Sequence, residues 1–147
     1  MTTSTYMSKL KHIENYKNFS QYFIKKGKKA TAEKIFKSGL IFWIKNIENK
    51  NFDSILQNAF ALTKPSVGVK TKRKGSKNIY LPVKLTEGRS NFLSSKWMYS
   101  NALSKKKRKL YEGVIEELMD SSMKKSNSNK KCEELHKLAE ESLVNMR

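Results

Sequence analysis

The chain has 147 residues, of which 37% are hydrophobic and 30% charged, and this length and composition suit one folded domain with a modest core. Its 31 basic residues outnumber the 13 acidic ones, so the formal net charge is +18. Positive charge of this density repels itself unless a polyanion neutralises it. Nucleic acid is therefore the expected partner, ahead of an anionic membrane surface.

Simple features of the chain exclude several protein classes. Its longest apolar run, at 40–44, is far shorter than the ~18 residues that span a bilayer. Cys132 is the single cysteine, so an intramolecular disulfide is impossible. The first thirty residues contain no arginine and no apolar signal core, and they predict neither a typical mitochondrial presequence nor a secretion signal. We expect a basic, partly extended segment at 1–14 and one helical domain at 15–147.

The spacing of apolar residues predicts three helices before residue 65. Phe19, Phe23 and Ile24 indicate a first helix that stops near Gly27. A second helix at 30–48 should bury Ala32, Ile35, Phe36, Leu40, Trp43 and Ile47. A third should bury Ile55, Leu56, Ala59, Phe60 and Leu62. Pro65 ends the third helix, because proline disfavours the α conformation of the residue before it.

After Pro65 the apolar period changes from 3.6 to 2, which predicts a β-hairpin at about 66–85. Apolar residues at 79, 81, 83 and 85 alternate with others that include Tyr80, and "KGSKN" at 74–78 supplies turn formers. An isolated two-stranded hairpin is marginally stable in water. We therefore expect a projecting arm that is ordered against something negative.

Three further helices are predicted after the hairpin. Thr86 can cap a fourth helix with the core residues Phe92, Leu93, Trp97 and Leu103. Ser104 can cap a fifth with Leu110, Val114, Ile115, Leu118 and Met119 inward. A sixth, after Asn129, places Leu135, Leu138, Ala139, Ser142 and Met146 on one stripe. The expected fold is mainly α, a single domain of about six helices with a two-stranded arm between the third and the fourth.

The arm carries the strongest candidate binding residues. They are Lys70, Lys72, Arg73, Lys74 and Lys77. Along a strand, alternate residues share one face at intervals of ~6 to 7 Å, close to the spacing of successive phosphates. Tyr80, on the outward strand face, is a candidate for stacking on an unpaired base. The competing interpretation is a solvated hairpin whose lysines only prevent edge aggregation.

Further basic residues extend the candidate surface. Arg89 and Lys96 lie on the polar side of the fourth predicted helix, and "KKGKK" adds Lys25, Lys26, Lys28 and Lys29 around Gly27. "KKKRK" at 105–109, which includes Lys105, Lys106 and Arg108, should begin the fifth helix. Cations at a helix N-terminus interact unfavourably with the positive end of the helix dipole. Bound phosphates would offset this unfavourable energy. Alternatively, the basic run at 105–109 is an import-like signal or serves only to keep the protein soluble.

The chain offers little for catalysis or metal binding. Cys132 and His136 are four residues apart, but two ligands without a third make a weak metal site. Glu116, Glu117 and Asp120 are expected to form a solvent face that pairs with lysines rather than an acid/base dyad. We expect no enzyme, no cofactor and no metal.

Several segments occur in the order and spacing of a known family. They are "GKKATAEKIF" (27–36), "KPSVGVKTKRKGSKNIYLPVKL" (64–85), "RSNFLSSKWM" (89–98), "ELMDSS" (117–122) and "KKCEELHKLAEESLVNMR" (130–147). Over about 19–147 the chain resembles the small-subunit ribosomal protein seven family. Two departures are visible: Ser76 and Lys77 follow Gly75 where the family usually has a Gly-Gly turn, and 126–129 replace a glycine-rich loop by a segment expected to be more mobile.

The resemblance implies a structural constituent of the small ribosomal subunit. Members of that family bind small-subunit ribosomal RNA at a junction of the 3′ major domain and support assembly of the head. They lie beside head and platform proteins, near exit-site tRNA and mRNA. It adds Lys130 and Lys131 to the expected RNA contacts. The alternatives are a general DNA-binding architectural protein that uses a basic β-arm and, more remotely, a peripheral membrane protein.

Composition also bears on the compartment. Lysine outnumbers arginine 27 to 4, the bias of an AT-rich genome. We expect an organelle-encoded protein of the mitochondrial ribosome in the matrix, with a plastid or the bacterial cytoplasm as alternatives.

Overall fold

The computed structural model describes residues 19–46 and 52–146. Its elements in chain order are α3 (Lys29–Asn46), α4 (Phe52–Thr63), β1 (Val67–Lys74), β2 (Lys77–Lys84), α5 (Glu87–Ser104), α6 (Leu110–Ser122), α7 (Asn127–Glu141) and the 3₁₀ turn η1 (Ser142–Met146). The mainly helical fold class with a two-stranded antiparallel arm between α4 and α5 is confirmed. The segment predicted at 1–14 and the core position Ile47 lie outside the described residues.

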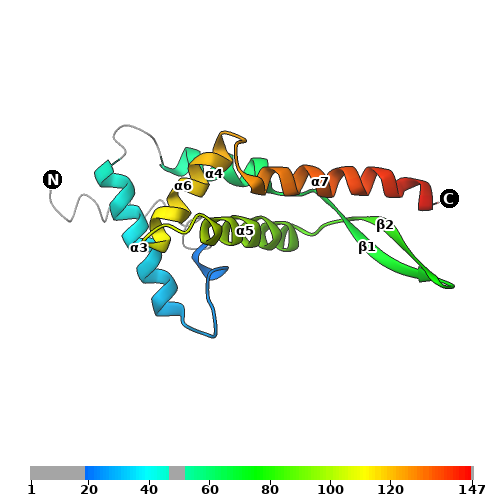
Figure 1. The fold of residues 1–147 in the computed structure, drawn as a ribbon, viewed down its shortest axis with the longest axis horizontal. Coiled ribbons are helices and arrows are strands. Elements are labelled where there is room, and N and C mark those ends of the chain that lie inside the picture. The colour runs from blue at the N-terminus through cyan, green and yellow to red at the C-terminus, as the bar shows by residue number, and fades with distance from the viewer. Residues whose placement is uncertain (1–18, 47–51, 147) are drawn as a thin grey trace.

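The elements form an elongated molecule. Figure 1 shows α3 and α6 at one end and the arm at the other, with α5 running between them along the long axis and α7 continuing beside the arm. The start of α5 therefore lies near the base of the arm, and its end lies near α3 and α6. This arrangement spreads residues 64–109 along the whole length of the protein.

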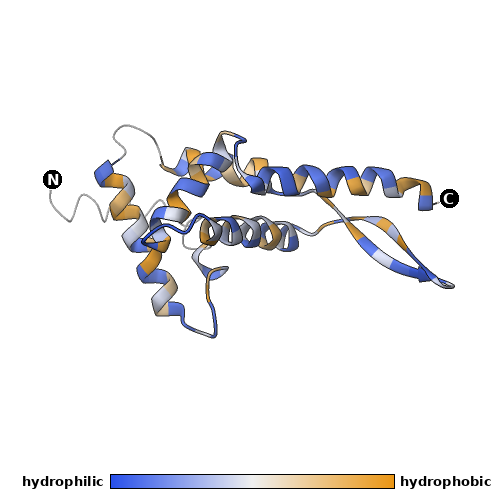
Figure 2. Cartoon of the chain, in the orientation of Figure 1, coloured by the Kyte–Doolittle hydropathy of each residue, from blue (hydrophilic) through white to orange (hydrophobic). Residues whose placement is uncertain are grey.

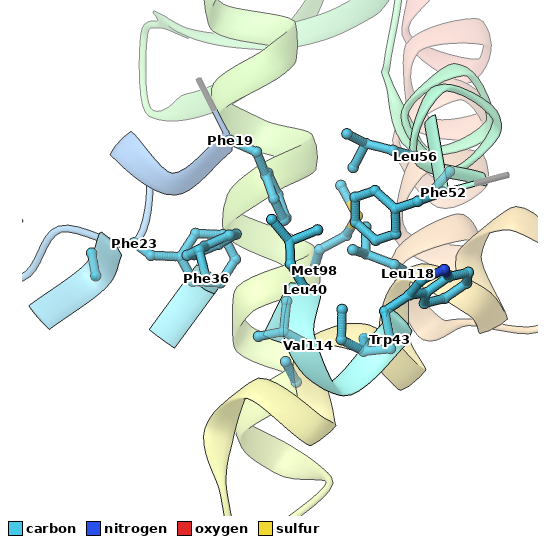
Figure 3. Close-up of a cluster of buried hydrophobic side chains, with 14 residues drawn as sticks. Phe19, Phe23, Phe36, Leu40, Trp43, Phe52, Leu56, Met98, Val114 and Leu118 are labelled. Carbon is cyan, nitrogen blue, oxygen red and sulfur yellow. The ribbon is translucent and has the colours of Figure 1, made fainter. Parts of the chain in front are cut away.

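The hydrophobic core lies at the helical end and is rich in aromatic side chains (Figure 3). Phe23 packs edge to face on Phe36 with ring centroids 4.7 Å apart, and Trp43 packs on Phe52 at 5.1 Å. Such pairs add ~0.5 to 1.5 kcal/mol each beyond simple burial. Phe19 and Phe23 are buried as expected, but the helical conformation at 19–21 ends well before Gly27. That glycine instead lies in a turn with φ of +74°, after Lys26 at +53°.

The strands of the arm are longer than predicted and its turn is shorter. Residues 74 and 77 still pair across the hairpin, so the loop is Gly75–Ser76 alone. Gly75 has φ of +62°, which two-residue loops of type II′ require at their first position. A single glycine is therefore sufficient for the tip.

Apart from Met98, helix α5 faces the core with small and polar residues, so its predicted core face was wrong. Phe92 and Leu103 are 38% and 48% exposed, and Leu93 and Trp97 are half-buried. The buried positions are Ser90, Ser94, Ser95, Met98, Asn101 and Ala102. The hydroxyls are tolerated there because most are hydrogen bonded: Ser94 Oγ lies 2.6 Å from Thr63 Oγ1, and Ser90 donates to the carbonyl oxygen of Pro65. Small side chains also allow α6 to approach closely at Gly113.

The boundaries of the last two helices also differ from expectation. Ser104 closes α5 rather than capping the next helix, and residues 105–109 form a linker before α6 starts at Leu110. Five cations at a helix N-terminus oppose its dipole, which accounts for the later start. Helix α7 begins at Asn127, because the side chain of Ser126 accepts the backbone N–H of Ser128. Residues 126–129, expected to be a mobile loop, are instead a helix start that is largely buried.

The base and the middle of the arm are supported by the C-terminal elements. His136 Nε2 of α7 accepts the backbone N–H of Ser66 at 3.3 Å, and Asn145 Nδ2 of η1 donates to the carbonyl oxygen of Tyr80 at 3.1 Å. Met146, predicted to be in the core, is 64% exposed because η1 lies beside the arm rather than against the core. The arm is thus supported from Ser66 to the level of Tyr80, and among the described residues no such contact reaches the turn at Gly75–Ser76.

A substitution at Gly113 tests the close approach of α5 and α6. A Cβ at this position would lie 2.8 Å from the backbone carbonyl oxygen of Ala102. Gly113→Ala should therefore lower the free energy of unfolding by ~1 to 3 kcal/mol in urea titrations. The matched control is Gly88→Ala, where a Cβ meets no atom within 4 Å and the change should be neutral or slightly stabilising. Equal stability of the two variants would contradict the close packing.

Candidate nucleic-acid interface

The tip of the arm is exposed on both faces. Every residue from 70 to 78 is exposed, and Figure 2 shows hydrophilic residues over much of this part of the arm. The pairing register places Lys70 opposite Leu81, Lys72 opposite Ile79, and Lys74 opposite Lys77. Because directly paired residues point to the same side of a sheet, Lys70, Lys72, Lys74 and Lys77 share one face, which we call the lysine face. Four exposed cations on one side of a narrow hairpin suit a phosphate backbone.

Tyr80 and Arg73 lie on the opposite face of the arm. Tyr80 pairs with Thr71 and is 45% exposed, and Arg73 pairs with Asn78. Tyr80 is therefore accessible, but it does not share a face with the lysines; Ile79 and Leu81 do. The arm presents two chemically different sides, one of ammonium groups and one of a phenol ring beside a guanidinium group.

The outward face of α5 contributes cations and an aromatic ring. Arg89 and Lys96 are both exposed, and the guanidinium carbon of Arg89 lies 5.3 Å from the ring centroid of Phe92. Phe92 was missed as a surface residue because its apolar character suggested the core. The helical spacing of positions 89, 92 and 96 was the available signal, since it places Phe92 between two cations on one face.

Every second residue of the 105–109 linker contacts a side chain of α6. Lys105 Nζ lies 3.3 Å from Glu117 Oε2 and also contacts Asp120, Lys107 pairs with Glu116 at 2.9 Å, and the Lys109 ammonium lies 5.6 Å from the Tyr111 ring centroid. The Glu116 carboxylate, through its hydrogen bond and its charge, raises the pKa of Lys107. Lys106 and Arg108 are exposed, and neither side chain has a recorded partner among the described residues. They are the cations of this linker that remain available to a ligand.

The acidic cluster is only partly the solvent face that was expected. Glu116 and Asp120 do pair with lysines, but Glu117 is buried at 2% exposure, where that interpretation was wrong. Its carboxylate accepts hydrogen bonds from serine hydroxyls and is described further below. A buried, fully bonded carboxylate is a structural group rather than half of an acid/base pair.

Two further basic clusters are exposed but separate from the arm. Lys25, Lys26, Lys28 and Lys29 are all exposed around the Gly27 turn, at the end of the molecule away from the arm (Figure 1). Lys130 is exposed and Lys131 is half-buried in the first turns of α7. The structure therefore does not bring all predicted site residues together; it distributes them along an elongated surface.

The described residues contain no arrangement suited to metal binding or to a membrane span. They hold no group of three or more His, Cys, Asp and Glu side chains that could bind a metal ion. Within the same ranges, no helix combines the length and the apolar character needed to cross a bilayer. His136, one of the two candidate ligands, already accepts the Ser66 N–H.

A helical body with an exposed basic arm has the electrostatic features of nucleic-acid-binding proteins. Residues 2–142 match the family described as ribosomal protein S7p/S5e. The chain belongs to this family, which is structural and non-enzymatic. The absence of an enzymatic role is thus supported by the family.

Curated relatives agree with this assignment. The chain is 33% identical to the small ribosomal subunit protein uS7 of Chlamydia caviae, over 78% of this chain and 73% of the relative. It is 29% identical to uS7 of Colwellia psychrerythraea over 88% and 82%, and 33% identical to uS7 of Mycoplasma mobile over 78% and 72%. Most of the length of each relative is therefore represented here.

The environment of Cys132 predicts low thiol reactivity. Burial, with a smaller contribution from the charge of Glu133, raises the pKa of the Cys132 thiol above its usual value. Because the thiolate is the reactive form, the thiolate fraction at a given pH is lowered. Alkylation by iodoacetamide at pH 8 should be at least ~10-fold slower in the folded protein than in urea. Equal rates, followed by mass spectrometry, would contradict the burial of this thiol.

Proposed function

We propose that this chain is a structural constituent of the small ribosomal subunit that binds small-subunit ribosomal RNA directly. The observation that carries the proposal is the exposed arm tip with its lysine face, in a member of the S7p/S5e family. The relatives are named as small ribosomal subunit proteins, which supports the same assembly for this chain.

The RNA contacts are proposed for the exposed cations along the long axis. They are Lys25, Lys26, Lys28, Lys29, Lys70, Lys72, Arg73, Lys74, Lys77, Arg89, Lys96, Lys106, Arg108, Lys130 and Lys131, with Tyr80 as a stacking residue. Lys105 is left out of this set, because two carboxylates already neutralise its charge. An elongated surface of this kind suits several RNA helices better than a single short site.

The finer features that we propose are those expected from the resemblance to the family. We place the chain on the 3′ major domain, where it supports assembly of the head beside other head and platform proteins, with the arm near exit-site tRNA and mRNA. The lysine-rich composition favours a mitochondrial ribosome encoded by the organelle's genome, and a plastid or the bacterial cytoplasm is the alternative. Cell fractionation followed by sedimentation after a high-salt wash identifies both the compartment and the subunit.

Charge removal on the arm tests its role in RNA binding. Changing Lys70, Lys72 and Arg73 to alanine should weaken binding to a 3′ major-domain RNA fragment. Since each phosphate contact contributes ~0.9 to the slope of log K against log salt, the slope should become shallower by ~2 to 3. The matched control changes Lys34, Lys37 and Lys45, three exposed cations of α3, and should leave the slope nearly unchanged. Equal losses in both triple variants would mean that net charge, and not the arm, drives binding.

Competition between nucleic acids separates this function from a general DNA-binding architectural role. A specific contact surface distributed over α5, the linker and the arm requires a folded RNA junction, whereas a β-arm in a groove needs only duplex. A junction fragment should therefore displace the chain from duplex DNA of equal length at physiological salt, measured by fluorescence anisotropy. Preference for the duplex would favour the architectural role instead.

A further inference from the structure

Glu117 is the one charged residue in the buried set of the described chain. A carboxylate removed from water is unfavourable unless it is paired and hydrogen bonded. Its neighbours on α6 follow the ordinary pattern, since Glu116 and Asp120 reach the surface and pair with lysines there. A buried charge at this position therefore calls for a structural explanation.

The first oxygen of Glu117 holds the start of α7. Oε1 accepts hydrogen bonds from Ser128 Oγ at 2.8 Å and from Ser126 Oγ. Asn101 of α5 donates to Ser128 Oγ at 2.8 Å and lies 3.5 Å from the same carboxylate oxygen. One atom of Glu117 thus joins α5, α6 and the first turn of α7.

The second oxygen of Glu117 holds the basic linker. Oε2 lies 3.3 Å from Nζ of Lys105, whose side chain is only 19% exposed and also donates a hydrogen bond to Asp120 Oδ2 at 2.5 Å. Directly after Lys105, the chain enters the left-handed region at Lys106, with φ of +47°. A residue with a Cβ rarely adopts this conformation unless its surroundings impose it. The Lys105 anchor is the nearest such constraint.

We infer that Glu117 is a positioning residue for RNA binding: by holding Lys105 inward, it fixes the linker so that Lys106 and Arg108 face the ligand. The inference rests on the proposed function. The contact from Lys107 to Glu116 differs in kind, because both side chains are about half exposed, at 44% and 43%, and such surface ion pairs contribute little order. A linker ordered in advance loses less conformational freedom when RNA binds.

Electrostatics alone predicts the opposite effect for this residue. A carboxylate near the linker repels phosphates, so its removal should strengthen RNA binding if charge is all that matters. If Lys105 itself contacted RNA, releasing it from Glu117 would also strengthen binding. Of the three explanations, only a positioning role predicts that RNA binding weakens when the negative charge of Glu117 is removed.

The test compares two substitutions with the same charge change in the full chain. Glu117→Gln should weaken binding to a 3′ major-domain RNA fragment by ~10-fold, because the linker is no longer ordered in advance. The matched control is Glu116→Gln, at the preceding position, where the side chain is 43% exposed; it should leave binding unchanged or slightly tighter. Asp120→Asn, which removes the more exposed partner of Lys105, should have a smaller effect than Glu117→Gln. Binding by Glu117→Gln as tight as that of Glu116→Gln would overturn the inference.

Limited trypsin digestion gives a readout that does not depend on RNA. Cleavage within 105–109, normalised to cleavage at Arg73 in the exposed tip, should be faster in Glu117→Gln than in the wild-type protein and unchanged in Glu116→Gln. Unchanged linker cleavage in Glu117→Gln would overturn the positioning role. If instead the wild-type chain fails to bind the RNA fragment, or Arg108→Ala binds normally, the proposed RNA-binding role of the linker fails while the digestion result stands.

A double substitution covers the case in which Glu117→Gln does not fold. Lys105→Met with Glu117→Gln removes both charges, so no unpaired charge remains buried and the net charge of the chain is unchanged. This variant should bind RNA as weakly as Glu117→Gln and show the same rapid linker cleavage. Wild-type affinity and wild-type cleavage in the double variant would overturn the inference.

Discussion

The crowding of positive charge between Lys64 and Lys109 constrains the whole fold. This segment holds fourteen basic residues and one acidic residue, and none of the cations can be buried without a partner. Twelve of them are exposed, on the arm, on the outer side of α5 or in the linker. The other two, Lys64 and Lys105, are half-buried, and each contacts a carboxylate, at Glu87 and Glu117 respectively. Separation of these cations along an elongated body limits their mutual repulsion and leaves them available to a polyanion.

Much of the fold could be predicted from periodicity, and the errors have identifiable physical causes. The change from period 3.6 to period 2 after Pro65 located the arm, because alternation is a direct consequence of strand geometry. The core face of α5 could not be found in the same way, since hydrogen-bonded serines and a close helix approach replace the apolar stripe there. The linker was mistaken for a helix start because sequence spacing does not show that Lys106 takes a left-handed conformation.

The cations of the candidate interface are easier to find from the sequence than the contacts they make or the faces they share. Basic residues are nearly always exposed, so listing them required no knowledge of the fold. Which of them are neutralised by the protein depends on contacts between distant elements, such as that of Lys105 with Glu117. The separation of Tyr80 from the lysine face likewise depends on the register, which a two-residue loop at Gly75 determines. Phe92 was misassigned because an apolar ring beside a guanidinium group on the surface looks, in sequence, like part of a core.

The support of the arm by α7 and η1 has a consequence for the order in which the protein matures. The contacts from His136 to Ser66 and from Asn145 to Tyr80 join residues that are 70 and 65 positions apart. Pairing of β1 with β2 is local and forms early, whereas closure of such long loops is slow. During synthesis, the arm therefore leaves the translating ribosome well before α7 and η1, which support it. During that interval the strongly basic hairpin lacks the support of α7 and η1, and early binding of a polyanion would protect it until those elements form.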